Sequence, residues 1–203
     1  MAADWEEDSP RLRGNLIELL ETLADAAPAR HAIDVQAVKA WHRRTMQGLR
    51  VPDPALVGVF RGEPGAERLR VHVGSHEGVP PAQVAGEVGR FEATLARVLA
   101  RLDEIVPAGA ALTTDGAAAV VELAAWAHGE WVRIHPFCNG NGRTARILAN
   151  VILMRYGLPP ALRLRPRPEG RYAVASFEAM RGNHQPMVAV IVEALRDQTA
   201  PPP

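Results

Sequence analysis

Residues 135–146 read HPFCNGNGRTAR, an order that predicts an anion-binding turn at the start of a helix. Gly140, Asn141 and Gly142 stand directly before a helical pattern, and glycine lets successive backbone N–H groups converge on one point. A helix N-terminus adds partial positive charge. Arg143 and Arg146 are three residues apart, so they share one face of the first turn, where guanidinium groups can bind phosphate oxygens. The stretch therefore predicts a polyphosphate site.

His135 lies just upstream of this turn, at the end of an apolar segment. A histidine near neutral pH can take a proton from a hydroxyl group. A histidine base beside a polyphosphate site favours attack of a hydroxyl on a phosphorus of a bound di- or triphosphate. The apolar Phe137 is expected to anchor the loop in the core. Taken singly, each feature has a structural reading: a plain turn, two solvated arginines and a helix-capping histidine. Their combination in one short stretch favours the site.

The segments around this stretch indicate a mainly α protein. Apolar residues recur every three or four positions, as in amphipathic helices, and a capping residue such as Asp34 precedes some of them. Residues 57–61 and 69–73 flank a Gly/Pro/acid loop, which indicates a β-hairpin. The expected architecture is a helical bundle with one β-hairpin inserted between helices. The expected helices cover residues 15–27, 34–49, 81–105, 114–134, 143–157, 172–182 and 185–198.

Composition narrows the class of protein. The chain has 203 residues, of which 47% are hydrophobic, enough for one domain with a sizeable core. The 23 basic and 23 acidic residues balance, so neither nucleic acid nor an anionic membrane is an expected partner. One cysteine, no apolar N-terminal segment and no long apolar run lead us to expect a cytoplasmic protein. Lys39 is the only lysine, and this preference for arginine is typical of a bacterial genome rich in G and C.

The stretch 135–146 resembles the signature of the Fic family, His-Pro-Phe-x-(Asp/Glu)-Gly-Asn-Gly-Arg-x-x-Arg, at eight of its nine defined positions. The resemblance extends to the segments AWHRRTMQGL, GVFR, RVHVGSHEGVPPAQVAGEV and LAAWAHGEWVRIHPF. It covers about residues 33–195, which we expect to be the Fic domain. Residues 1–32 would form an N-terminal tail and helix, and residues 196–203 a flexible tail.

The resemblance implies a helical core with a β-hairpin flap and transfer of AMP from ATP, or another nucleoside monophosphate from its triphosphate, to a Ser, Thr or Tyr hydroxyl of a target protein. His135 would be the general base. Family members with lysine at the position of Gly142 act as kinases, so glycine favours nucleotidyl transfer. The remaining implied roles are an anion hole of Gly140, Asn141 and Gly142, a β-phosphate contact from Arg143, a γ-phosphate contact from Arg146, and a target-aligning flap of Leu69, Arg70, Val71, His72, Val73 and Gly74.

Asn139 stands where the family has Asp or Glu. In the family that acid binds the Mg²⁺, or Mn²⁺, that bridges the phosphates, and a neutral amide oxygen attracts such a hard cation far less. Asn139 is therefore expected to be a weak or absent metal ligand. Three outcomes follow. The first is slower AMP transfer, and the second is the use of an unusual phosphate donor, with transfer to a small molecule. The third is a nucleotide- or partner-binding module without turnover.

Many Fic proteins carry an inhibitory helix with the pattern (Ser/Thr)-x-x-x-Glu-(Gly/Asn). Residues 9–15, SPRLRGN, match it except that Arg13 replaces the glutamate, which suggests a relict inhibitory segment without glutamate-based autoinhibition. The alternative is that Ser9 merely caps the first helix. A separate antitoxin or regulatory partner is also conceivable for this family.

Other side chains that can carry chemistry have simpler readings. Cys138 follows His135 closely, but a nucleophilic cysteine needs a base and an oxyanion hole. An arginine cluster after residue 162 is expected to be a solvated loop or a rim that contacts nucleotide or partner. That cluster comprises Arg163, Arg165, Arg167 and Arg171, and the histidines without metal-ligand spacing are His42, His72, His76, His128 and His184.

Overall fold

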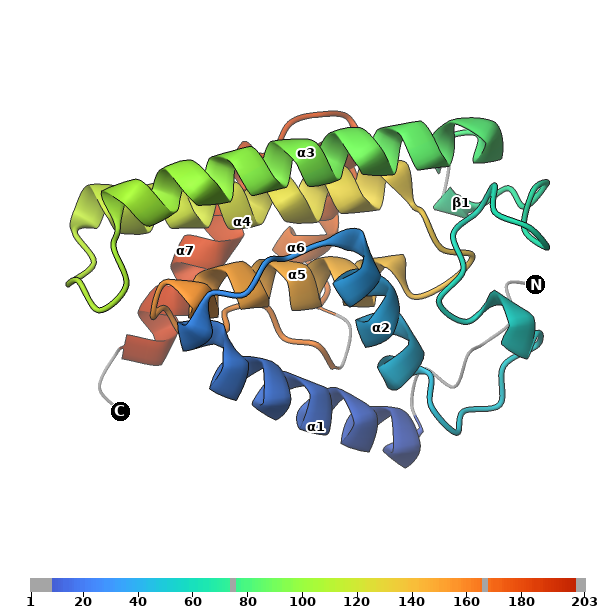
Figure 1. Cartoon of the computed structure of the whole chain (residues 1–203), viewed down its shortest axis with the longest axis horizontal. Coiled ribbons are helices and arrows are strands. Elements are labelled where there is room, and N and C mark those ends of the chain that lie inside the picture. Colours follow the sequence, from blue (N-terminus) through green and yellow to red (C-terminus); the bar gives the residue numbers. More distant parts are fainter. Residues whose placement is uncertain (1–8, 74–75, 166–167, 200–203) are drawn as a thin grey trace.

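The computed structural model describes residues 9–73, 76–165 and 168–199, which form a helical bundle (Figure 1). The described residues contain seven α-helices, two short 3₁₀ turns and two strands. The mainly α prediction is confirmed. The helices are α1 (Pro10–Ala26), α2 (Val35–Thr45), α3 (Pro81–Ile105), α4 (Thr114–Ile134), α5 (Asn141–Arg155), α6 (Arg171–Met180) and α7 (Gln185–Thr199), with 3₁₀ turns η1 (Ala27–Ala29) and η2 (Pro54–Leu56).

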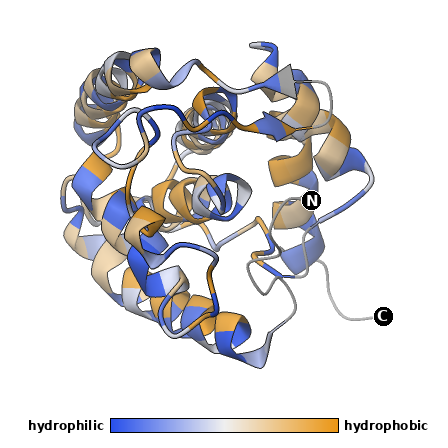
Figure 2. Cartoon of the chain, turned by 90° about the vertical axis from the view of Figure 1, so that its right-hand side faces the viewer, coloured by the Kyte–Doolittle hydropathy of each residue, from blue (hydrophilic) through white to orange (hydrophobic). Residues whose placement is uncertain are grey.

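Helices α4 and α5 form the centre of the bundle. Helix α4 packs against α3, α5, α6 and α7, while α5 also contacts α1 and α2 (Figure 1). Both central helices carry small or apolar residues on nearly every side, as buried helices do. In α5 even Arg143, Arg146 and Asn150 are buried. The peripheral helices instead alternate hydrophobic and hydrophilic residues around their circumference (Figure 2).

Two residues considered as caps from the sequence do cap helices, although the first helix begins at Pro10 and not at the expected residue 15. The Ser9 hydroxyl accepts a hydrogen bond from the backbone N–H of Leu12 at 3.1 Å, so Ser9 does cap the first helix. The Asp34 carboxylate accepts one from Ala37 at 2.7 Å. The last helix ends at Thr199, next to the end expected at residue 198. None of the helices in the described residues is long and apolar enough to cross a membrane.

The expected β-hairpin between residues 57–61 and 69–73 was wrong. In the described residues the only ladder joins β1 (His72–Val73) to β2 (His76–Glu77), two residues on each side. The first predicted stretch bonds elsewhere, because the N–H of Arg61 donates to Pro136 in the α4–α5 loop at 2.7 Å. The intervening loop closes on itself through Gly62 N–H to Ala66 O at 2.9 Å, so no extended partner is available.

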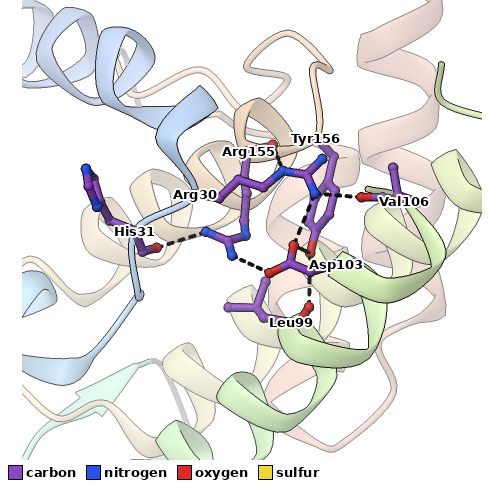
Figure 3. Close-up of polar contacts among 7 residues, drawn as sticks. All are labelled: Arg30, His31, Leu99, Asp103, Val106, Arg155 and Tyr156. Carbon is purple, nitrogen blue, oxygen red and sulfur yellow. Dashed lines mark hydrogen bonds and ion pairs between the residues drawn. The ribbon is translucent and has the colours of Figure 1, made fainter. Parts of the chain in front are cut away.

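A polar cluster fixes the end of α5 that lies away from residues 135–146 (Figure 3). The carboxylate of Asp103 on α3 accepts hydrogen bonds from Arg155 at 2.6 Å and from the Tyr156 hydroxyl at 2.9 Å, and Arg30 lies 3.3 Å away. Burial, followed by the nearby Asp103 carboxylate, raises the pKa of Tyr156 to about 12. The Asp103 cluster therefore joins the C-terminal ends of α3 and α5 to the segment after α1.

Replacing the shared carboxylate tests this connection. We expect Asp103→Ala to lower the free energy of unfolding by about 2 kcal/mol, because the guanidinium of Arg155 is nearly buried and would lose its anionic partner. Urea denaturation gives the value. Glu104→Ala is the matched control, since Glu104 pairs with Arg101 on the exposed surface and such pairs contribute about 0.5 kcal/mol or less. Equal effects of the two substitutions would contradict a structural role for the Asp103 cluster.

Candidate active site

The loop between α4 and α5 begins at His135, which has the left-handed backbone conformation, φ 52°. That conformation is uncommon for a residue with a side chain and ends α4 sharply. The ring nitrogen Nδ1 lies 2.5 Å from the carbonyl oxygen of Val132. Because a carbonyl only accepts, Nδ1 carries the hydrogen, and Nε2 of the neutral ring is the proton acceptor. His135 thus has the tautomer that a general base requires.

Arg61 fixes the backbone of this loop through hydrogen bonds to its carbonyl groups. Its side chain is 1% exposed and donates to the carbonyls of His135 at 2.7 Å, Ile134 at 3.0 Å and Leu69 at 3.3 Å. These carbonyls include the last groups of α4, which have no partner within the helix. Arg61 therefore fixes His135 and the segment that follows Leu69 to one another. No local pattern in the sequence predicts this role, because Arg61 and His135 are 74 residues apart.

Phe137 anchors the middle of the loop, as expected. Its ring is fully buried, stacks on His42 with centroids 4.0 Å apart, and packs against Phe60 and Trp131. The Asn141 side chain accepts a hydrogen bond from the Phe137 N–H and donates to its carbonyl, both at 2.8 Å. The amide of Asn141 consequently faces the protein, and only its backbone N–H is placed for an anion.

The turn before α5 has the geometry that the glycines predicted. Gly140 caps the helix with φ 78°, and a side chain there would meet Met46 at 2.8 Å and His42 at 3.1 Å. Thr144 makes the first backbone bond of the helix, to the carbonyl of Gly140 at 3.0 Å. The N–H groups of residues 141–143 therefore lie in the first turn, where a helix offers donors and partial positive charge to an anion.

Both motif arginines come from α5 and line the same cavity. Arg143 is 4% exposed and donates to the side-chain oxygen of Asn139 at 3.1 Å. Arg146 is 3% exposed and donates to the Tyr172 hydroxyl at 3.1 Å and to the carbonyl of Leu164 at 3.2 Å. Two buried guanidinium groups on one face of a helix start bring fixed positive charge to the cavity.

The cavity has a volume of about 540 Å³ and brings together most of the predicted site residues. His135, the 139–143 turn and Arg146 form one wall, and Val71, His72 and Val73 form another. Arg70 points outward and pairs with Glu77, whereas Leu69 contacts Arg61 through its carbonyl. Gly74, also expected in the flap, lies outside the described residues.

A third wall comes from α6, which the sequence did not connect with the site. Tyr172, Ala173, Ser176, Phe177 and Met180 line the cavity, and the Phe177 ring is 39% exposed. An exposed aromatic ring beside the turn that begins α5 offers a stacking surface for a planar group. Only the apolar spacing of α6 was visible in the sequence, and that spacing does not say which face meets a cavity.

Two of the histidines without metal-ligand spacing support the site residues. His42 accepts from the Gly58 N–H at 3.0 Å through Nδ1, so its Nε2 donates to the carbonyl of Asn139 at 3.1 Å. Burial, opposed by the bond to Asn139, lowers the pKa of His42 to about 4. His128 lies 2.9 Å from the Tyr172 hydroxyl, and burial lowers its pKa to about 3. Both rings are neutral at physiological pH.

The structure does not support a catalytic role for the other side chains considered in the sequence. Burial raises the pKa of Cys138, the opposite of what a thiolate nucleophile needs. Arg13 does not line this cavity but an apolar groove that also includes Leu16, Arg163 and Arg165. Arg171 pairs with Glu193 on the surface, and Arg167 lies outside the described residues. In the part of the chain that is described, no group of three or more His, Cys, Asp or Glu residues is arranged to hold a metal ion.

Comparison with known proteins agrees with this geometry. Residues 32–153 match the Fic/DOC family, and the chain belongs to that family. It is 32% identical over 161 residues to "Protein adenylyltransferase Fic" of Drosophila erecta, an alignment that covers 79% of this chain and 28% of that protein. The chain thus spans little more than a quarter of that relative.

Solved structures show the same fold. Fic-1 from C. elegans is 27% identical with a TM-score of 0.61, covering 94% of this chain and 51% of that one. The BepC protein of Bartonella tribocorum, solved with bound AMPPNP, is 20% identical with a TM-score of 0.61, covering 92% of this chain and 87% of that one. These matches confirm the helical Fic fold.

Acid titration tests the buried state of His42. Its pKa is about 4 in the folded chain against 6.5 ordinarily, so the unfolded state takes up a proton first as the pH falls through 6.5. Its contribution is present above that pH and is lost progressively towards pH 4. From about pH 7 to pH 5 this costs about 2 kcal/mol of unfolding free energy. His42→Gln should flatten the decline by that amount in urea titrations.

His42→Ala separates titration from hydrogen bonding. It should flatten the pH profile as His42→Gln does, while lowering stability at neutral pH by about 1–3 kcal/mol because Gly58 loses its acceptor. An unchanged profile in both variants would show that His42 does not titrate as a buried neutral ring.

Tyr172→Phe tests the contact between α6 and Arg146. Removing the hydroxyl leaves a buried guanidinium N–H of Arg146 and Nε2 of His128 without this partner, so we expect about 1–3 kcal/mol of lost unfolding free energy. Urea denaturation measures it. Ser176→Ala, on the same helix and the same cavity, should change stability by about 0.5 kcal/mol or less. A silent Tyr172→Phe would contradict the contact.

Proposed function

We propose that the chain is a nucleotidyltransferase that moves a nucleoside monophosphate, AMP in the first instance, from a nucleoside triphosphate to a hydroxyl group of a target protein. One observation carries the proposal. His135, with Nε2 as proton acceptor, and the donors at the start of α5 line a single cavity. The name of the relative in Drosophila erecta and the AMPPNP bound to BepC support the same reaction class.

In this reaction Nε2 of His135 takes the proton of the attacking hydroxyl. The hydroxyl oxygen forms a bond to the α-phosphorus, and the bond from that phosphorus to the bridging oxygen breaks. Pyrophosphate leaves with the electron pair. The N–H groups of residues 141–143 would stabilise the charge that develops on the α- and β-phosphates, and Arg143 and Arg146 would hold the β- and γ-phosphates. Phe177 would stack on the nucleobase.

Residues 71–73 would position the acceptor segment of the target. Val71 and Val73 line the cavity beside His135, and their backbone lies at the start of a very short ladder. An extended peptide can pair with such a backbone edge and present one side chain to the base. Because the ladder is only two residues long on each side, a short extended segment of the target protein would be enough to pair with it. Such a segment can come from a loop or a chain terminus of the target.

A second candidate function rests on Asn139. The amide replaces the acid of the family signature, so the chain can be a module that binds nucleotide without turnover. The two candidates share the cavity and its phosphate donors. They differ in whether His135 removes a proton from an acceptor, and that difference can be measured.

The test is transfer followed by intact mass. The chain is incubated with each common nucleoside triphosphate and a bacterial lysate, with Mg²⁺, with Mn²⁺ and with a chelator. We expect one protein to gain the mass of a nucleoside monophosphate, and His135→Ala to reduce the rate about 10³-fold. His31→Ala, an exposed histidine outside the cavity, is the control and should leave the rate unchanged. No mass gain with any donor, while nucleotide still binds, would favour the binding module.

A further inference from the structure

Asn139 lines the cavity beside the turn that begins α5, and both of its oxygens already accept hydrogen bonds. The side-chain oxygen accepts from Arg143 at 3.1 Å. The backbone oxygen accepts from Nε2 of His42 at 3.1 Å, and that nitrogen must be the donor because Nδ1 accepts from Gly58. A cation at either oxygen would lie against a hydrogen-bond donor, and at the side chain against a positive one.

The rest of the cavity offers poor ligands for magnesium. Among the described residues that line it there is no aspartate or glutamate. The other side chains with a lone pair to offer include His72, His135 and Cys138, whose nitrogen and sulfur atoms suit softer metals. The hydroxyls of Tyr172 and Ser176 carry no charge, and that of Tyr172 already accepts from Arg146. Magnesium prefers carboxylate oxygens together with phosphates and water. The residues present do not fit a resident Mg²⁺ site.

The positive charge that a metal would bring is supplied by the protein instead. Arg143 and Arg146 are each at most 4% exposed and project from the first turns of α5 into the cavity. Buried guanidinium groups are weakly screened by solvent and bind phosphate oxygens through paired N–H groups. The helix start adds backbone donors to the same wall. A divalent cation placed among these groups would be repelled by them.

We propose that this cavity binds the polyphosphate of a nucleotide in its metal-free form, with Arg143, Arg146 and the start of α5 in place of the divalent cation. The inference rests on the proposed function only in taking a nucleotide as the ligand. A magnesium complex is less negative than the free triphosphate by the charge of the ion. A cavity wall of positive donors with an amide at residue 139 therefore favours the free triphosphate.

Calorimetric titration of the full chain with ATP tests the proposal, once in a chelator and once with excess Mg²⁺. We expect the Kd in the chelator to be lower than, or within about threefold of, the Kd with Mg²⁺. A Kd in the chelator more than about tenfold weaker than with Mg²⁺ would overturn the proposal. Absence of ATP binding in both buffers would overturn it as well.

A charge substitution at one position sharpens the test. Asn139→Asp should weaken ATP binding in the chelator about tenfold, because the carboxylate repels phosphate and pairs with Arg143, and Mg²⁺ should restore it. Asn183→Asp makes the same charge change at an exposed position outside the cavity and should leave both Kd values unchanged. If Asn139→Asp gains no magnesium dependence, residue 139 does not decide the metal requirement and the proposal fails.

The titration and the transfer assay can disprove the metal-free site and the transferase independently of one another. Metal-free ATP binding by a chain that transfers nothing would remove the proposed transferase and leave the metal-free site. Transfer that needs Mg²⁺, together with loss of ATP binding in the chelator, would keep the transferase and remove the metal-free site. The comparison within the unmodified chain stands even if a variant does not fold.

Discussion

The pair of hydrogen bonds between the Asn141 side chain and the backbone of Phe137 is the constraint on which the site depends. It closes the loop between α4 and α5 into a fixed turn, with the Phe137 ring sunk among His42, Phe60 and Trp131. Only with that turn closed do His135 and the first N–H groups of α5 face one cavity. Arg61 holds the same turn from its other side, through the carbonyls of residues 134 and 135.

The polar side chains of the candidate site divide into those that face the cavity and those that hold the loop backbone in place. His135, Arg143 and Arg146 present groups to the cavity, while Asn141, His42 and Arg61 spend their hydrogen bonds on the backbone. Burial keeps His42 neutral, so it can accept at one nitrogen and donate at the other. A charged ring could not make both bonds, so the loop geometry holds while His42 stays neutral, which in the folded chain means above about pH 4.

Much of the fold was visible in the sequence because helix periodicity and caps are local. The pattern of α4 and α5, the Asp34 cap, and the glycines before Arg143 all depend on neighbours a few residues away. The hairpin prediction failed because the backbone N–H of Arg61 donates to Pro136 in the α4–α5 loop, while those of Val57 and Val59 donate to residues three positions earlier. His42 and Asn139 are 97 residues apart, and no local sequence pattern predicts a contact over that separation. The same holds for Tyr172 and Phe177, whose helix shows only that it is amphipathic.

The proposed proton acceptor and the proposed phosphate donors belong to different helices. His135 ends α4, while the N–H groups and arginines begin α5, and the far end of α5 is tied to α3 through Asp103. The separation between base and phosphate is therefore a property of how two buried helices pack along their whole length. Small buried side chains on these helices, such as Ala124 on α4 and Ala145 on α5, let the neighbouring helices approach closely, so the core itself determines how far the proposed base lies from the proposed phosphate donors.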